Sequence, residues 1–184
     1  MTGTKDAKQR VMHATMELLR EGGLRAAAPA AIADRAGAGK MSLYRHFGSK
    51  DELIAEALRD NGERSRAWIL GSADDGEPRE RVLAIFDRIA DRADRGVLRP
   101  CVYLMTRLEV AEPDHPAVAV TVEYKQHVVD TLTAWLREMN HPEPESIAQA
   151  IAALLDGCIV HAVIKEDAQP VRDARRAAEI LLGN

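Results

Sequence analysis

Residues 32–53 of the chain read IADRAGAGKMSLYRHFGSKDEL, and this stretch decides the fold that we expect. It reads as a short helix, a turn that contains Gly37 and Gly39, a second short helix and then the start of a longer one. Ser49 and Glu52 stand three positions apart, which is the spacing of a capping box at a helix N-terminus. The pattern therefore predicts a helix-turn-helix followed by a capped helix.

The second short helix carries an unusual number of polar and basic side chains for its length. They are Lys40, Ser42, Tyr44, Arg45 and His46, with Lys50 just beyond. Exposed hydrogen-bond donors on a short helix are what a protein needs to read a DNA major groove. Taken singly, Tyr44 and Phe47 also suit a helical core, and Lys50 also suits a solvated helix start. Their combination with the turn glycines and the capping box favours DNA binding.

Composition places the chain among folded globular proteins. Of its 184 residues, 46% are hydrophobic and 29% charged, which suits one or two small domains with a proper core. The longest apolar run, residues 150–164, is interrupted by Asp156 and His161 and is too short to span a bilayer. The N-terminus lacks the pattern of an export signal. Two cysteines make no disulfide framework. We therefore expect a cytoplasmic protein that does not bind a membrane.

Charge is distributed unevenly along the chain. Residues 1–50 hold nine Lys and Arg against four Asp and Glu, a net charge of +5, while the remainder holds sixteen against twenty-five, a net charge of −9. A basic head on an acidic body suits a protein whose head alone meets a polyanion. Chance clustering in a short segment is the alternative, so the asymmetry supports DNA binding without establishing it.

Helical periodicity extends over almost the whole sequence. Gly22-Gly23, the turn at residues 37–39, the linker at residues 71–78 and several prolines separate the periodic segments. We expect an all-α protein of about nine helices, with an N-terminal three-helix DNA-binding domain at 1–50 and a helical effector-binding and dimerisation domain at 51–184. A helix at about 50–70 connects the two. The expected helices cover residues 8–21, 30–36, 40–47, 50–68, 82–93, 101–110, 116–139, 147–164 and 171–182.

Two of these helices carry more apolar surface than one small core needs. The segment 147–164 is apolar nearly all round, and the segment 116–139 bears two apolar stripes. A helix that is apolar on every face is buried on every face, which favours a homodimer formed by these helices. A central core helix in a monomer is the alternative. The predicted interface residues are Val118, Val122, Val129, Leu132, Leu136, Ile151, Leu154, Leu155, Cys158 and Ile159.

The N-terminal region resembles the DNA-binding domain of the tetracycline-repressor (TetR) family. The resemblance rests on RVMHATMELLREGG at residues 10–23 and AAIADRAGAGKMSLYRHFGSKDELIAEAL at residues 30–58, and LYRHFGSKDEL is its most specific part. Residues 99–118 and 152–163 resemble, more weakly, the divergent ligand-binding domains of some members. The resemblance implies a dimeric repressor that binds double-stranded DNA at a palindromic operator. A small-molecule effector, not identified by the sequence, would release it.

The family's DNA contacts transfer to individual positions of this chain. The implied contacts to the DNA backbone are Tyr44, His46 and Lys50, and Ser42 stands where a small hydroxyl residue contacts phosphate or a base edge. The implied sequence readers, at positions where members vary, are Lys40, Met41 and Arg45. Arg45 or Lys40 would pair with guanine in the major groove. Leu43 and Phe47 are expected in the core.

The first helix of the motif departs from the family pattern. Ala27–Pro29 replaces the usual hydroxyl residue that caps this helix and touches phosphate, and Ala30 and Ala31 stand where polar or basic side chains are common. Gly39 replaces a common serine cap, which costs only a few tenths of a kcal/mol. Fewer phosphate contacts predict weak non-specific binding and a shallow salt dependence.

An apolar pocket with a few polar groups is the default expectation for the effector site. The candidate lining residues are Trp68, Phe86, Tyr103, Met105, Arg107, Glu109, His127 and His161, although core packing or surface exposure also explains each of them. Cys158 and His161 share a helix face, and together with Cys101 they suggest a metal or thiol-sensing site as a minor alternative. We expect no metal site and no cofactor.

Enzymatic activity is the competing functional class, and the sequence does not favour it. The six histidines form no HExxH helix, and there is no GxSxG elbow or glycine-rich phosphate loop. A dimeric helical scaffold that binds protein, with weak or no DNA binding, is the stronger alternative because the alanine-rich helix lacks phosphate contacts.

Overall fold

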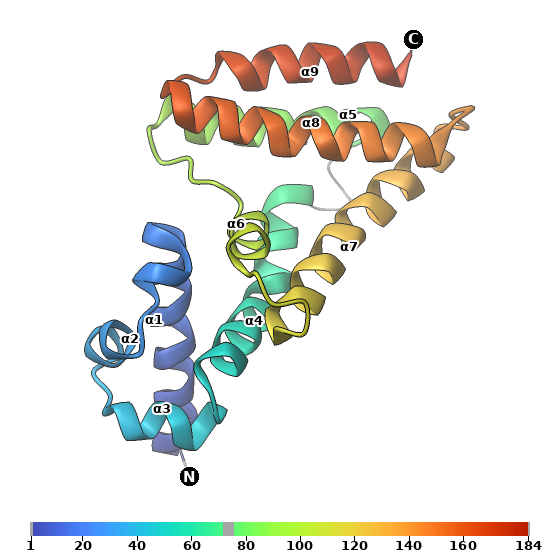
Figure 1. Ribbon diagram of the computed structural model, residues 1–184. Helices are drawn as coiled ribbons and strands as arrows, with labels where there is room; N and C mark the ends of the chain where they lie inside the picture. The colour runs from blue at the N-terminus through green and yellow to red at the C-terminus, as the bar shows by residue number, and fades with distance from the viewer. Residues whose placement is uncertain (1, 72–75, 184) are drawn as a thin grey trace. The chain divides into compact units, whose positions relative to one another are not determined.

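The computed structural model describes residues 2–71 and 76–183, with side chains from residue 7 onward, so residues 72–75 of the expected linker lie outside it. The described residues form nine α-helices and no strand (Figure 1). The all-α prediction is therefore confirmed. The helices are α1 (Thr2–Ala26), α2 (Pro29–Ala36), α3 (Lys40–Phe47), α4 (Lys50–Leu70), α5 (Pro78–Asp94), α6 (Val102–Glu109), α7 (Pro116–Glu138), α8 (Pro144–Lys165) and α9 (Gln169–Leu182).

Glycine and proline set most helix boundaries. Gly22 and Gly23 have non-helical dihedral angles and interrupt α1 where the sequence predicts its end. Gly37 ends α2 in the left-handed conformation, with φ 59°, which glycine adopts without the steric cost that a Cβ imposes. Prolines stand in the first turns of α2, α5, α8 and α9, where a missing N–H breaks no helical hydrogen bond.

The contacts divide the chain into two compact units that do not follow the linear order of the sequence. Unit 1 contains residues 1–63 and 102–124, and unit 2 contains residues 64–101 and 125–184. Helices α4 and α7 each contribute to both units, and α6 belongs with the N-terminal helices.

Unit 1 is built on α1, which packs against α2, α3 and α6. Its apolar interior joins residues from α1, α2 and the first half of α4. Fully or almost fully buried members are Val11, Leu19, Ile32, Leu53, Ile54 and Leu58. Helices α2 and α3 pack on this interior, so the core of unit 1 fixes the position of the exposed face of α3.

Unit 2 is a layer in which α9 packs against both α5 and α8 (Figure 1). Its interior includes Ile85, Phe86, Ile89, Leu132, Leu136 and Ile151, all with no or almost no exposed surface. At the edge of the layer, Arg172 pairs with Asp94 at 2.7 Å and Arg175 with Asp87 at 2.7 Å. These exposed pairs orient α9 on α5 and add little free energy, since surface ion pairs are worth about 0–1 kcal/mol.

Candidate nucleic-acid interface

Helix α3 is short because a glycine stands at each end. Gly39 is its N-cap and supplies no side-chain hydrogen bond, and the N–H of Gly48 donates to the carbonyl oxygen of Tyr44 at 2.9 Å. Gly48 has φ 76°, which residues other than glycine rarely adopt. This conformation turns the chain sharply toward α4. The eight residues between these glycines form two turns of helix, enough to present one face outward.

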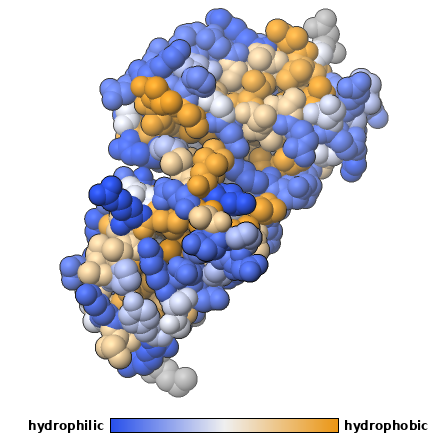
Figure 2. All heavy atoms as spheres, viewed as in Figure 1, coloured by the Kyte–Doolittle hydropathy of each residue, from blue (hydrophilic) through white to orange (hydrophobic). Residues whose placement is uncertain are grey.

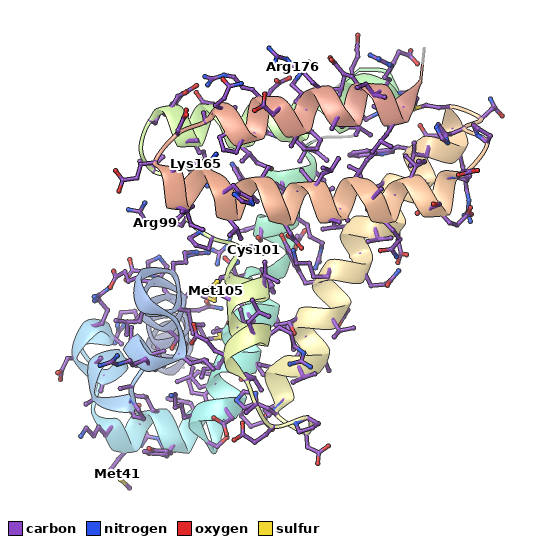
Figure 3. All side chains as sticks on the ribbon, turned by 45° about the horizontal axis from the view of Figure 1, so that its top comes forward. Met41, Arg99, Cys101, Met105, Lys165 and Arg176 are labelled. Atoms are coloured by element: carbon purple, nitrogen blue, oxygen red, sulfur yellow. The ribbon has the colours of Figure 1, made fainter. Side chains whose placement is uncertain are left out.

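The two faces of α3 differ in burial as the sequence predicts. Leu43 and Phe47 are 3% and 7% exposed and pack into unit 1. Lys40, Met41, Tyr44 and Arg45 are exposed, and Ser42 and His46 are half-buried. Met41 points away from the ribbon into solvent (Figure 3) and is 81% exposed. Lys40, Met41, Tyr44 and Arg45 therefore share the exposed surface of α3, and their contact with DNA stays a prediction.

The basic side chains near α3 differ in whether they form ion pairs with acidic neighbours. Arg35 on α2 makes hydrogen bonds of 2.8 and 3.0 Å to the carboxylate of Glu21, and these bonds lower the pKa of Glu21. Lys8 pairs with Glu56 and lies over the ring of Phe47. The side chains of Lys40 and Arg45 form no ion pair with another described residue. Their charge is consequently available to an external anion.

The start of α4 shows one of the two hydrogen bonds of the predicted capping box, while the N–H of Ser49 donates to the carbonyl oxygen of Phe47 at 2.9 Å rather than to Glu52. The Ser49 hydroxyl accepts a hydrogen bond from the N–H of Glu52 at 3.0 Å. The Nζ atom of Lys50 donates to the carbonyl oxygen of Leu24 at 3.2 Å. An ammonium group has three N–H donors, so this contact leaves donors for a phosphate. Contact between Lys50 and DNA stays a prediction.

Helix α2 begins without a side-chain cap. Its N-cap, Ala28, has an extended backbone and makes no side-chain hydrogen bond, and Pro29 follows it. Ala30 is exposed and Ala31 is half-buried, so the first turn presents methyl groups where a cation or hydroxyl would grip phosphate. The surface beside α3 is therefore poor in phosphate ligands.

A buried polar network that the sequence does not reveal connects three helices of unit 1. Arg20 on α1 donates to the side-chain oxygen of Asn61 on α4 at 2.8 Å. The amide nitrogen of Asn61 donates to the hydroxyl of Tyr103 on α6 at 3.2 Å, and this hydroxyl donates to the carbonyl oxygen of Leu58 at 3.0 Å. The sequence gives no signal for this network, because Asn61 stands among charged residues at 59–64 and looks like part of a solvated helix surface.

The eight candidate effector residues are not gathered into one pocket within either unit. Trp68, Phe86, His127 and His161 belong to unit 2, and Tyr103, Met105, Arg107 and Glu109 belong to unit 1. Phe86 has no exposed surface, His127 and His161 are exposed, and the side chain of Arg92 lies over the ring of Trp68 at 4.7 Å.

The α6 candidates in unit 1 have structural partners. Tyr103 is 1% exposed and stacks on Tyr124, with ring centroids 3.6 Å apart. Glu109 accepts a hydrogen bond from the N–H of Leu24. Arg107 is exposed and Met105 is half-buried. Tyr103 and Glu109 therefore serve the packing of unit 1, and a role of any of these residues in effector binding stays a prediction.

The cysteines do not form a metal-binding group with their neighbours. No cluster of three His, Cys, Asp or Glu side chains suited to a metal occurs among the residues that the structure describes. Cys158 is 5% exposed, and burial raises its pKa to about 12. A thiol in this state is a poor ligand and a poor nucleophile at neutral pH.

Several residues of the predicted dimer interface are buried within the chain itself. Leu132, Leu136 and Ile151 have no exposed surface, and Leu155, Cys158 and Ile159 have little. Leu132 and Leu136 on α7 and Ile151 on α8 pack in the core of unit 2, so they leave no side-chain surface for a partner. Val118, Val129 and Leu154 are half-buried, and Val122 is 56% exposed.

An open apolar groove instead lies between α8 and α9. Its volume is about 850 Å³, and its lining residues are Ala150, Ala153, Leu154, Gly157, Cys158, His161, Pro170, Asp173, Ala174, Ala177, Ile180 and Leu181. Figure 2 shows apolar side chains gathered on the visible face of this unit. Helix α8 contains the apolar run of residues 150–164 and is long and apolar enough, by length and composition, to cross a membrane, which corrects the expectation that this run is too short. One such helix is weak evidence for a membrane span, and 33% of its most apolar window is buried. The contribution of α9 to this surface was not predicted from the sequence. Ile180 on α9 is 81% exposed.

Comparison with known proteins finds a family model that matches the N-terminal helices and relatives that match most of the chain. The family model described as "Bacterial regulatory proteins, tetR family" matches residues 11–57. The chain is 30% identical to the HTH-type transcriptional repressor KstR of Rhodococcus jostii over 152 residues, which cover 82% of this chain and 68% of KstR. It is 28% identical to the HTH-type transcriptional regulator BetI 1 of Chromohalobacter salexigens, over 93% of this chain and 86% of that protein.

Solved structures extend the likeness to nearly the whole chain. A putative TetR transcriptional regulator from Streptomyces avermitilis superposes with a TM-score of 0.83 at 28% identity, over 94% of this chain and 97% of that one. The reduced form of Escherichia coli NemR has a TM-score of 0.82 at 18% identity, over 95% and 96% of the two chains. Both similarities cover α1–α3 and the C-terminal helices together.

Proposed function

The chain belongs to the tetR family of bacterial regulatory proteins, and on this premise we propose that it is a transcriptional repressor that binds DNA as a homodimer and releases it when a small molecule binds. Its relatives are transcriptional regulators that bind DNA through a helix-turn-helix, and this general role is common to the family. The dimer, the operator symmetry and the response to an effector are the proposed parts.

The exposed face of α3 carries the proposal. It brings Lys40, Met41, Tyr44 and Arg45 to the surface while Leu43 and Phe47 anchor the helix. In a helix-turn-helix the second helix lies in the major groove. We assign base reading to Lys40, Met41 and Arg45, and phosphate contact to Ser42, Tyr44, His46 and Lys50. These assignments are what the resemblance to the family implies, and the exposure and side-chain chemistry of Lys40, Met41, Tyr44 and Arg45 support them.

A second copy of this chain is the proposed occupant of the groove between α8 and α9. The groove is open and lined mainly by small and apolar side chains, and such a surface is costly to leave in water. Two helices from each copy would form a four-helix interface related by a two-fold axis. A two-fold dimer also suits reading of two half-sites about one turn of DNA apart. The interface predicted from the sequence lay on α7 and α8; this proposal keeps α8, whose Leu154 and Cys158 line the groove, and replaces α7 by α9.

The effector is proposed to act through a change in the distribution between two conformations. A ligand shifts such an equilibrium only by its difference in affinity for the two states. Helix α4 contributes to both compact units and begins at Lys50, directly after the recognition helix α3, so we expect a change among the C-terminal helices to reach the DNA-binding unit through it.

Binding to the DNA that flanks its own gene tests the function directly. Fluorescence anisotropy with a labelled duplex of that region is measured at low salt, and a scrambled duplex of the same composition is the competitor. We expect saturable binding that the specific duplex competes away far better than the scrambled one. Absence of sequence-dependent binding would favour the alternative suggested by the bare first turn of α2, a dimeric scaffold that binds protein.

A further inference from the structure

The kink at Gly22 and Gly23, near the end of α1, has an unusual backbone, and we call the segment from this kink to the start of α2 the joint between α1 and α2. Gly23 has φ 65° and ψ −158°, a combination that is essentially restricted to glycine. A Cβ atom at this position would lie 2.1 Å from the Oε1 atom and 2.6 Å from the Oε2 atom of Glu109. The glycine therefore serves two purposes, because it allows the bend and it allows a carboxylate to approach the main chain.

Side chains from two other helices hold the main chain at the next residue. The Oε2 atom of Glu109 on α6 accepts a hydrogen bond from the N–H of Leu24 at 2.6 Å, across 85 residues of sequence. The carbonyl oxygen of Leu24 accepts one from the Nζ atom of Lys50 at 3.2 Å. Both polar groups of Leu24 are thus bound by charged side chains, and hydrogen bonds to charged groups are among the stronger ones.

Helix α6 is itself firmly attached to unit 1, so it is able to position the joint. It packs against α1. Tyr103, near its start, bonds to Asn61 and to the carbonyl oxygen of Leu58 on α4. Beyond its end, the side chain of His115 is 8% exposed and lies 3.3 Å from the Oδ1 atom of Asp51 in the first turn of α4. Glu109 therefore projects from a fixed support.

We infer that Glu109 is a positioning residue for DNA binding, an inference that rests on the proposed function. By holding the N–H of Leu24, its carboxylate sets the direction in which α2 leaves α1. Because α3 packs on α2, that direction also sets where the exposed face of α3 stands. Glu109 does not touch DNA in this scheme, since a carboxylate repels phosphate.

The sign of the mutational effect separates this role from a simple charge effect. Removing an acidic side chain from a DNA-binding unit ordinarily strengthens binding, because it lessens repulsion from the phosphates. Loss of a positioning contact weakens binding instead. Glu109→Ala removes the acceptor, Glu109→Gln keeps a neutral acceptor oxygen, and Glu112→Ala removes an exposed carboxylate of the neighbouring loop as the matched control.

Full-length protein and its variants are titrated with the specific duplex. We expect Glu109→Ala to bind about tenfold more weakly, a change of about 1.4 kcal/mol, with the salt dependence unchanged because no phosphate contact is lost. Glu109→Gln should recover most of the affinity, and Glu112→Ala should bind as tightly as the unmodified protein or more tightly. Equal or tighter binding by Glu109→Ala would overturn the inference.

Hydrogen exchange at the amide of Leu24 gives a readout that is independent of DNA. We expect faster exchange in Glu109→Ala than in the unmodified protein, with no change in Glu112→Ala. Unchanged protection in Glu109→Ala would also overturn the inference, and Glu109→Gln supplies the comparison if the alanine variant does not fold. If the unmodified protein does not bind the duplex, the proposed function fails, whereas binding that is indifferent to residue 109 contradicts only the positioning role.

Discussion

The side-chain amide of Asn61 donates a hydrogen bond to the hydroxyl of Tyr103 at 3.2 Å, and both side chains are almost fully buried. The two residues lie 42 positions apart, and their contact links α4 to α6. Since Arg20 also donates to Asn61, this polar contact ties the N-terminal helix to a helix that follows far along the chain. A buried network of this kind is costly to leave partly satisfied.

Tyr103→Phe should lower the free energy of unfolding by about 1–3 kcal/mol. The substitution keeps the stacking on Tyr124 and leaves the buried amide of Asn61 without its acceptor, which costs its desolvation. Urea denaturation at equal protein concentrations measures the change. Tyr44→Phe is the control, because that side chain is 45% exposed and should leave stability unaltered. Equal stability of Tyr103→Phe and the unmodified protein would contradict the network.

Ser49→Ala should also destabilise the protein, by about 1 kcal/mol, through loss of the N-cap of α4. The hydroxyl accepts the N–H of Glu52 in the described structure, and alanine leaves that donor to solvent. Ser49→Asp should retain the stability because aspartate accepts the same bond and suits a helix N-terminus. The same denaturation experiment checks both variants, and a loss in Ser49→Asp as large as in Ser49→Ala would argue against a capping role.

Ala30→Lys should steepen the salt dependence of DNA binding. Ala30 is exposed at the start of α2, where a cation is expected to reach phosphate, and each added contact changes the slope of log K against log salt by about 0.9 on duplex DNA. Anisotropy titrations at several salt concentrations give the slope. Gln126→Lys adds the same charge at an exposed position on α7 and should change it far less. Identical slopes for the two variants would place α2 away from the DNA.

Ile180→Glu should convert the dimer to a monomer of about 20 kDa in sedimentation velocity. Ile180 is 81% exposed and lines the α8–α9 groove, so a charge there would have to be buried against the second copy. Val122→Glu tests the interface on α7 predicted from the sequence, and it should remain dimeric. Dissociation by Val122→Glu, with Ile180→Glu still dimeric, would return the interface to α7.

The two cysteines should differ in reactivity toward an alkylating reagent. Burial raises the pKa of Cys158 to about 12, so at pH 8 only about one thiol in ten thousand is ionised and able to react. Cys101 is half-buried and should be modified first. Cys101→Ser and Cys158→Ser variants, labelled separately and followed by mass spectrometry, isolate each site. Rapid labelling of Cys158 in the folded protein would revive a thiol-sensing role.

The sequence alone was sufficient for the elements whose signals are local. Glycines and prolines mark the helix ends, and the Ser49 hydroxyl caps α4. The spacing of four positions between Leu43 and Phe47 places both on the inner face of α3, away from the polar outer face. Each of these features depends on residues within a few positions of one another, so backbone preferences and nearest-neighbour hydrogen bonds determine them. The residues resembling a DNA-binding domain fall within this local class.

Tertiary structure alone decided which helices share a core. The apolar stripe of α7 has the same composition whether it meets a partner or its own chain, and only packing shows that Leu132 and Leu136 are already buried. The bonds from Glu109 to Leu24 and from Asn61 to Tyr103 join residues 85 and 42 positions apart. No periodicity encodes such contacts, because they arise only once the helices between them have packed and brought distant side chains within hydrogen-bonding distance.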